Sequence, residues 1–207
     1  MEIFNELFDF ILATSRIYGI DESHDISHSM NVLHLAHDIY TSQLLITPEI
    51  ISHKNIIYIS AVLHDMCDKK YMNESEGINA IREHIRLITT PEENDIIVRI
   101  IQTMSYSTVK KNGFPDLGVY QTAYHIVREA DLLSAYDFDR AIIYDMKVNR
   151  KTFEEAYKHA LNIFNIRIFK HAQDNLFTTE YAKTHYQSLH SQAIQQIDTW
   201  KNIIDRK

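Results

Sequence analysis

The sequence predicts an all-helical protein that folds as one domain. Four Gly and three Pro in 207 residues leave little room for the tight turns of a sandwich or a barrel. Apolar residues recur at helical spacing, and no internal repeat or low-complexity tract interrupts them. A chain of this length can bury one sizeable core. We therefore expect a single domain over residues 1–207, with a core at about 20–145 and closing helices at about 152–204 packed on it.

The predicted helices follow one another through short connections, and their ends carry start and stop signals. They are expected at residues 2–18, 26–44, 47–64, 73–89, 90–101, 119–130, 131–146, 152–173 and 178–204. Gly19 can stop the first helix, and Asp25 or Ser27 can cap the second. Pro48 suits the first turn of the third helix.

The same kinds of signal mark later helices. Thr90-Pro91 opens the fifth, and Thr152 starts a capping box, TFEE, for the helix that reaches about residue 173. Residues 105–118 hold two of the four Gly and one of the three Pro. We therefore expect this stretch to be the one long loop, and Asp131 to open a separate helical segment after it.

Composition narrows the functional class. The 21 basic and 28 acidic residues give a net charge of -7 without a basic stripe, so no stable nucleic-acid partner is expected. The single cysteine, Cys67, excludes an internal disulfide and is expected as a small core residue. The chain shows neither a signal-peptide pattern nor an apolar run of membrane-spanning length. These features predict a soluble cytoplasmic protein without a membrane partner, and they leave its oligomeric state open.

The chemistry centres on the dipeptide His64-Asp65, at the end of an apolar run of helical density. Burying a carboxylate without a partner costs several kcal/mol or forces it to neutralise, so a cation or a hydrogen-bond network is expected. A lone His-Asp pair arises often by chance. His28, in the first turn of the second helix, and Asp131, set among apolar residues, add a second imidazole and a second carboxylate. This mixed set of ligands suits one divalent ion, namely Mn, Co, Ni, Fe, Zn or Mg.

Together these residues resemble the H...HD...D signature of the HD-domain phosphohydrolase superfamily, and in particular its small bacterial branch of the YpgQ and YedJ type. The phrases SHDISHSMNV, AVLHDMCDKKY and READLLSAYD carry the resemblance, which covers nearly the whole chain. It implies an all-helical fold that holds a metal between its helices. The implied ligands are His28, His64, Asp65 and Asp131, with coordination positions left open for water and a phosphate oxygen.

The resemblance further implies hydrolysis of a small-molecule phosphate substrate, with a nucleotide as the expected class and release of pyrophosphate from a nucleoside triphosphate as one possible reaction. Asp68, one helical turn beyond His64, can orient the water or take its proton; the alternative is a salt bridge to Lys69 or Lys70. Lys70 can neutralise a bound phosphate, or it can lie solvated on the surface. His24 can donate to a phosphate oxygen.

Two other functional classes stay open. Asn31 stands where the family form usually has Arg, and with the altered neighbourhood of the last ligand it motivates a non-catalytic metal- or nucleotide-binding regulatory module. The polar pair of Asp68 and Lys70 argues for an enzyme instead. An HD-type oxygenase with two irons would need further imidazoles, for which His84 and His125 are the suppliers.

Overall fold

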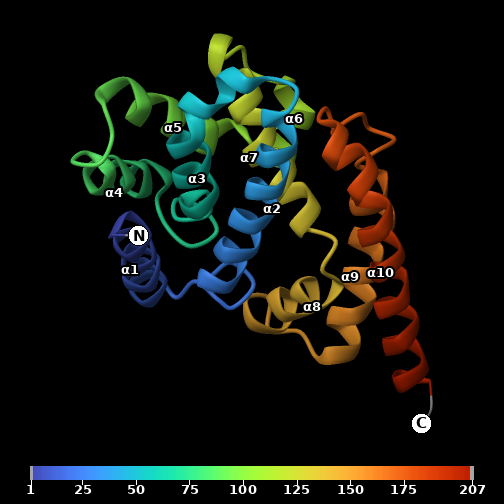
Figure 1. Ribbon diagram of the computed structural model, residues 1–207. Helices are drawn as coiled ribbons and strands as arrows, with labels where there is room; N and C mark the ends of the chain where they lie inside the picture. The colour runs from blue at the N-terminus through green and yellow to red at the C-terminus, as the bar shows by residue number, and fades with distance from the viewer. Residues whose placement is uncertain (1, 206–207) are drawn as a thin grey trace.

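The centre of the structure is a helix, α3 (Lys54–Leu63), in which every residue from Ile59 to Leu63 is buried. It packs against α2 (Ile26–Leu44) and α7 (Gln121–Ser134), and these two helices also pack against each other. In the computed structural model, which describes residues 2–205, the other helices lie on two sides of this trio (Figure 1).

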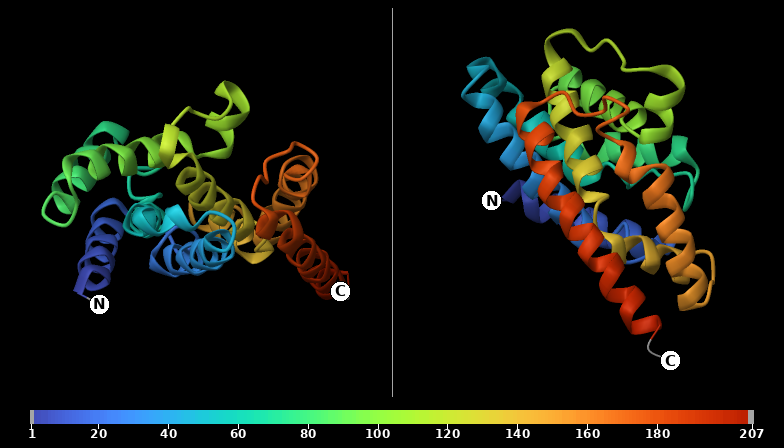
Figure 2. Two further views of the ribbon diagram at one scale, coloured as in Figure 1. Left: turned by 45° about the horizontal axis from the view of Figure 1, so that its top comes forward. Right: turned by 90° about the vertical axis from the view of Figure 1, so that its right-hand side faces the viewer.

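One side is built by the N-terminal half of the chain and the other by the C-terminal third, a separation that the left view of Figure 2 also shows. The first side comprises α1 (Glu2–Tyr18), α4 (Glu74–Ile85) and α5 (Pro91–Thr103), and the second comprises α8 (Phe138–Lys147), α9 (Phe153–Ile166) and α10 (Glu180–Ile204). Shorter pieces are α6 (Tyr106–Asn112) and the 3-10 helices η1 (Pro48–His53), η2 (Gly118–Tyr120) and η3 (Ile168–Lys170). The described residues contain no strand, which confirms the all-helical prediction.

Several predicted helix ends are confirmed by their caps. Gly19 adopts φ +66°, a conformation that suits glycine, directly after α1. The cap of α2 is Asp25, whose carboxylate accepts a hydrogen bond from the backbone N–H of Ser27 at 3.0 Å. Capping boxes start α5 at Thr90 and α9 at Thr152. The local signals therefore fix where these helices begin.

The prediction of one long loop over 105–118 is wrong. Seven of these residues form α6, because the Ser105 hydroxyl accepts a hydrogen bond from the backbone N–H of Thr108 and caps a helix there. Gly113 ends α6 with φ +75°. Only the short segment 113–117 lacks regular secondary structure, so the glycine and proline residues indicate the end of a helix and not a loop over the whole stretch.

The prediction that Asp131 opens a new helical segment is also wrong. Asp131 lies in the last turn of α7, which continues to Ser134. The next helix starts only at Phe138, where the carboxylate of Asp137 accepts hydrogen bonds from two backbone N–H groups. The cap at Asp137 sets the boundary, and Asp131 remains on a helix that packs against α2 and α3.

The helix that starts at Thr152 is shorter than predicted. It ends at Ile166, because Arg167 leaves the helical conformation with φ -133° and ψ -63°. The 3-10 helix η3 follows. Likewise, the third predicted helix begins as the 3-10 helix η1 and becomes α-helical at Lys54.

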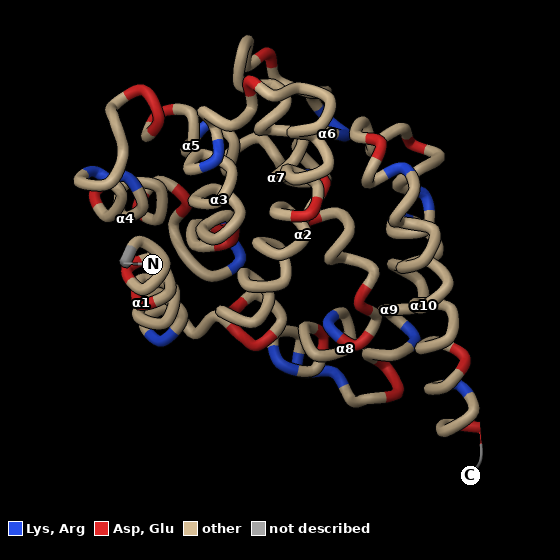
Figure 3. The backbone as a smooth tube through the Cα atoms, viewed as in Figure 1, with Lys and Arg blue, Asp and Glu red and all other residues tan. Residues whose placement is uncertain are grey.

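The charge pattern of the backbone trace shows Lys and Arg dispersed among Asp and Glu along the helices (Figure 3). In the described part of the chain, no helix is both long and apolar enough to cross a bilayer.

Candidate metal centre

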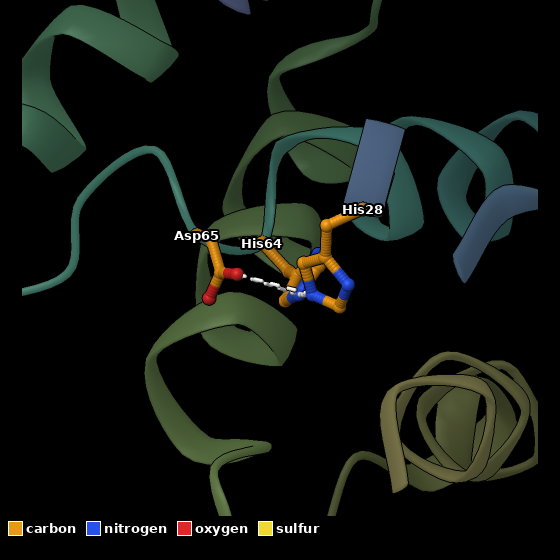
Figure 4. Close-up of side chains that lie close together, drawn as sticks. All are labelled: His28, His64 and Asp65. Atoms are coloured by element: carbon orange, nitrogen blue, oxygen red, sulfur yellow. Dashed lines mark hydrogen bonds and ion pairs between the residues drawn. The ribbon is translucent and has the colours of Figure 1, made fainter. Parts of the chain in front are cut away.

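Three of the predicted ligands meet where α2 begins and α3 ends, and their side chains point toward one another (Figure 4). The Nε2 atoms of His28 and His64 are 3.1 Å apart. Oδ2 of Asp65 lies 3.2 Å from the first nitrogen and 3.3 Å from the second. The three ligand atoms therefore lie within 4.8 Å of one another, a spacing that one ion can bridge.

The fourth predicted ligand approaches from α7. Oδ1 of Asp131 lies 3.7 Å from Nε2 of His28 and 3.6 Å from Nε2 of His64. Adjacent ligands of a metal ion bound at about 2.1 Å are separated by about 3.0 to 3.4 Å, so a small contraction would bring all four into range. The imidazoles are 1% and 3% exposed, against 15% for Asp65 and 26% for Asp131. The two carboxylates are therefore partly accessible from solvent, and the two imidazoles lie buried behind them.

The chemistry of these atoms fits a divalent cation. Oδ2 of Asp65 is buried and accepts no hydrogen bond. Nδ1 of His64 lies 2.9 Å from the carbonyl oxygen of Ala61, which can only accept, so this ring donates from Nδ1, and Nε2 is the nitrogen that would face a metal once it has lost its proton. A buried carboxylate oxygen without a hydrogen bond is unfavourable unless a positive charge lies beside it.

The pKa values favour the ionised carboxylates that a cation needs. Burial opposes ionisation of Asp65 and Asp131, yet the neighbouring His64 holds the pKa of both well below the usual range. Burial alone would lower the pKa of His64, but the two carboxylates raise it well above its usual range. For His28, burial and then the positive charge of Arg140 lower the pKa.

Arg140, on α8, makes the contact that departs from an ordinary metal site. Its Nη1 lies 2.6 Å from Nδ1 of His28 and 3.0 Å from the hydroxyl of Ser134. A guanidinium can only donate, so Nδ1 of His28 accepts and the proton of the neutral ring stays on Nε2. A metal-binding His28 needs the opposite tautomer. Coordination by His28 therefore requires Arg140 to leave this position.

Two cavities meet at Asp65 and Asp131. One, of about 310 Å³, extends between α8 and α9, and the other, of about 270 Å³, extends toward α5 and α6. The larger is at the lower limit of small-molecule pockets, which span roughly 300 to 1,000 Å³. Lys70 and Arg167 line both. A small anionic molecule beside the candidate metal ligands would therefore be within reach of two permanent cations.

The larger cavity is acidic before any ion is bound. Five carboxylates and three permanent cations line it, which leaves two negative charges uncompensated. These groups are Asp65, Asp68, Asp131, Asp137 and Asp145, with Lys70, Arg140 and Arg167. A divalent cation would offset that excess, so a phosphate could enter the cavity without net repulsion.

The remaining predicted site residues form one connected group. Nζ of Lys70 lies 2.8 Å from Oδ2 of Asp68 and 3.4 Å from Nε2 of His24. The salt-bridge alternative for Asp68 is therefore realised, and Asp68 also lines both cavities. Lys70 is 42% exposed, with its ammonium in the cavity and its pKa raised by Asp68 against the effect of burial. Burial lowers the pKa of His24 to about 4, so that ring is neutral at pH 7.

The turn after α3, which carries Asp68 and Lys70, packs closely against α4 at Gly77. A Cβ on Gly77 would lie 2.7 Å from Cα of Cys67, so only glycine allows this packing. Cys67 is a buried free thiol, and burial raises its pKa to about 12. The expectation of a small core residue is confirmed.

Sequence reasoning missed two cationic residues of the cavity, Arg140 and Arg167. The guanidinium of Arg167 lies 4.2 Å from the ring centroid of Tyr106, and its Nε is buried without a hydrogen-bond partner. Burial lowers the pKa of Arg167. Neither arginine is part of a sequence motif. The position of Arg167 depends on where α9 ends, which the sequence does not indicate.

The imidazoles required for a second iron are not brought to the cluster. Nε2 of His84 lies 3.1 Å from the backbone oxygen of Glu6, under α1, and its ring stacks on Phe10. His125 packs against Phe114 and near Arg128. The two-iron arrangement therefore lacks its further ligands in this structure.

The chain is similar to a protein from Lactobacillus plantarum whose crystal structure was determined as a Northeast Structural Genomics target. The two are 21% identical, the match covers 98% of this chain and 97% of that one, and the TM-score is 0.69. No family model and no curated protein matches the chain. At this identity the structural likeness establishes the fold alone.

Proposed function

We propose that this protein is a metal-dependent phosphohydrolase of the HD-domain type that acts on nucleotides or other small phosphate esters. The observation that carries the proposal is the convergence of His28, His64, Asp65 and Asp131 at a cavity that three cations also line. The resemblance to the YpgQ and YedJ branch adds pyrophosphate release from nucleoside triphosphates as one form of this activity.

The four ligands would hold one divalent ion, which supplies water of lowered pKa and draws charge from the phosphoryl oxygens. Asp68 lies one turn away and can accept the proton of the attacking water. Its ion pair with Lys70 keeps both groups at the mouth of the two cavities. His24, neutral and buried, orients Lys70 through the contact of Nε2 with Nζ.

Lys70, Arg140 and Arg167 are placed to bind the phosphate. Lysine supplies a compact positive charge, and arginine can bind two phosphoryl oxygens at once. Arg167 retains an unused Nε–H donor, and Arg140 is free to turn toward a phosphate when it leaves His28. Three cations around one anion would also stabilise the charge that develops on its oxygens during attack.

The test is phosphate and pyrophosphate release from a panel of nucleotides, catalysed by metal-stripped protein resupplied with Mn, Co, Ni, Fe, Mg or Zn. We expect turnover that depends on the metal and is lost in His64→Ala and Asp65→Ala. The released product names the bond that is cleaved. Full activity in either variant would refute the site assignment.

The same experiment separates the enzyme from the regulatory module. That alternative predicts a bound metal or nucleotide without turnover under any of these metals. The retained polar residues Asp68 and Lys70 favour the enzyme, since a binding module does not need a proton acceptor beside the ligands.

A further inference from the structure

A carboxylate and an imidazole form a second polar pair in the larger cavity, away from the metal ligands. Nδ1 of His159, on α9, lies 2.5 Å from Oδ2 of Asp145, on α8. Asp145 is 1% exposed and also accepts hydrogen bonds from the amide of Asn149 at 2.5 Å and the ammonium of Lys151 at 3.1 Å. These donors keep the carboxylate ionised and fixed, so the imidazole ring is oriented by a rigid partner.

The pair and the cluster border one cavity from different helices. Asp145 and His159 line the same 310 Å³ space as Asp65 and Asp131. The ligands come from the central trio of helices, whereas α9 lies beside α8 and α10 on the C-terminal side (Figure 1). A phosphate bound between them would have the metal ligands on one side and His159 on the other.

His159 has the access that proton donation requires. Its side chain is 44% exposed, so solvent can return a proton to it. With Nδ1 bound to Asp145, the protonated ring presents its second N–H from Nε2, which has no hydrogen-bond partner in the described structure. An imidazole fixed by a carboxylate is a common general acid.

Resting on the proposed phosphohydrolase function, we infer that His159, oriented by Asp145, donates the proton to the leaving oxygen, and that the substrates are phosphate esters of alcohols, such as a nucleoside 5'-monophosphate. Attack and departure lie roughly in line at phosphorus, which places the leaving oxygen opposite the attacking water. An alkoxide leaves poorly unless it is protonated. A pyrophosphate anion needs no such help, so a leaving-group acid points to esters.

The step balances without a further reactant. The water oxygen bonds to phosphorus and its proton passes to Asp68, while the bond from phosphorus to the alcohol oxygen breaks. The proton on Nε2 of His159 moves to that oxygen, which leaves as an alcohol. Solvent then takes the proton from Asp68 and returns one to His159.

A purely structural role predicts a different outcome. Asp145 also binds the connection between α8 and α9, since its backbone oxygen accepts from the N–H of Lys151 at 3.2 Å. If His159 only reinforced this connection, its loss would lower the melting temperature and slow all substrates by one common factor.

The experiment compares His159→Asn with the wild-type protein on adenosine 5'-monophosphate and on p-nitrophenyl phosphate, whose leaving group needs no proton. We expect kcat on the nucleotide to fall by about 10² or more, in the range of general acid catalysis, and kcat on the nitrophenyl ester to fall less than about tenfold. His159→Gln should show the same selectivity, and His185→Asn, on α10, should leave both rates unchanged. Metal affinity and melting temperature verify that each variant is folded.

A second measurement does not depend on turnover. In metal-free protein labelled with 15N-histidine, the His159 resonances are those that vanish in His159→Asn, and its Nε2 signal should shift when adenosine 5'-monophosphate is added. Equal losses on the two esters, or an unmoved Nε2 signal, would overturn the inference while the phosphohydrolase function stands. A wild-type protein with no metal-dependent hydrolysis would overturn both.

Discussion

Nη1 of Arg140 lies 2.6 Å from Nδ1 of His28, and this contact keeps the His28 proton on the nitrogen that faces the other candidate ligands. Metal binding by His28 and this hydrogen bond therefore exclude each other. Release of Arg140 upon metal binding would free a guanidinium beside the phosphate position.

Replacement of Arg140 by Gln should tighten metal binding. The variant removes both the donor that fixes the wrong tautomer and a positive charge that repels the ion. We expect the dissociation constant for Mn or Co to fall by about tenfold, within the effect of neighbours that orient metal ligands. Isothermal titration calorimetry on metal-free protein measures it, with the exposed Arg86→Gln as the control. Weaker metal binding in Arg140→Gln would show that Arg140 supports the site.

Metal affinity should decrease as the pH falls. The pKa of His64 is raised well above its usual range, so a proton occupies the ring at neutral pH and must leave when the metal binds. Below that pKa, each pH unit should weaken the apparent affinity by about tenfold for each proton displaced. Calorimetry in buffers with different ionisation enthalpies should detect the released proton. An affinity that does not change between pH 6 and 8 would contradict this assignment of the proton.

Lys70→Ala should weaken substrate binding and leave the metal in place. The ammonium of Lys70 lies in the cavity and is not among the candidate metal-binding groups. Its ion pair with Asp68 keeps it charged. Loss of one charge-assisted contact should raise KM by about tenfold, equivalent to about 1.4 kcal/mol. Lys201→Ala, at the far end of α10, is the control with the same loss of charge. A Lys70→Ala variant with wild-type KM on every phosphate ester would show that Lys70 is a solvated surface residue without a role in substrate binding.

Much of the fold and the first three candidate ligands could be predicted because their signals are local. His28 follows the cap at Asp25, and His64-Asp65 ends an apolar run, so the helix pattern itself places them. The sequence predicts that Asp131 lies near the cluster but not the boundary of its helix, because the apolar residues on both sides of it indicate burial with either boundary.

The other cavity residues depend on contacts between distant segments. Arg140 reaches His28 across 112 positions of sequence, and the place of Arg167 is set by the point at which α9 stops. Nothing in the residues around either arginine distinguishes it from a surface cation. The short helix α6 could not be predicted for a different reason, since the Gly and Pro residues at 113–118 follow it directly and suggest a loop for the whole stretch.

Glu129→Ala should destabilise the protein more than any change at the cavity mouth. Glu129 is fully buried and accepts hydrogen bonds from the backbone N–H and hydroxyl groups of Thr178 and Thr179, at the start of α10, and from Arg128. Its loss leaves the buried Arg128 unpaired, which costs about 3 to 5 kcal/mol of the free energy of unfolding. Thermal unfolding should show a melting temperature lower by about 6 to 20 °C. The exposed Glu180→Ala should change the melting temperature little. An equal effect of the two substitutions would show that the buried contacts of Glu129 do not stabilise the fold.

His171 should make the protein less stable in mild acid. The ring is fully buried among aromatic side chains, neither nitrogen has a hydrogen-bond partner, and burial lowers its pKa to about 3. Between pH 6.5 and 3 the unfolded chain binds a proton that the folded one refuses, so stability falls as pH falls, by up to about 1.4 kcal/mol per pH unit. Urea unfolding from pH 7 to 4.5 should therefore be less steep in pH for His171→Leu than for the wild-type protein or the exposed His34→Asn. Equal slopes in all three would place the acid sensitivity elsewhere, with the buried His24 as the next residue to test.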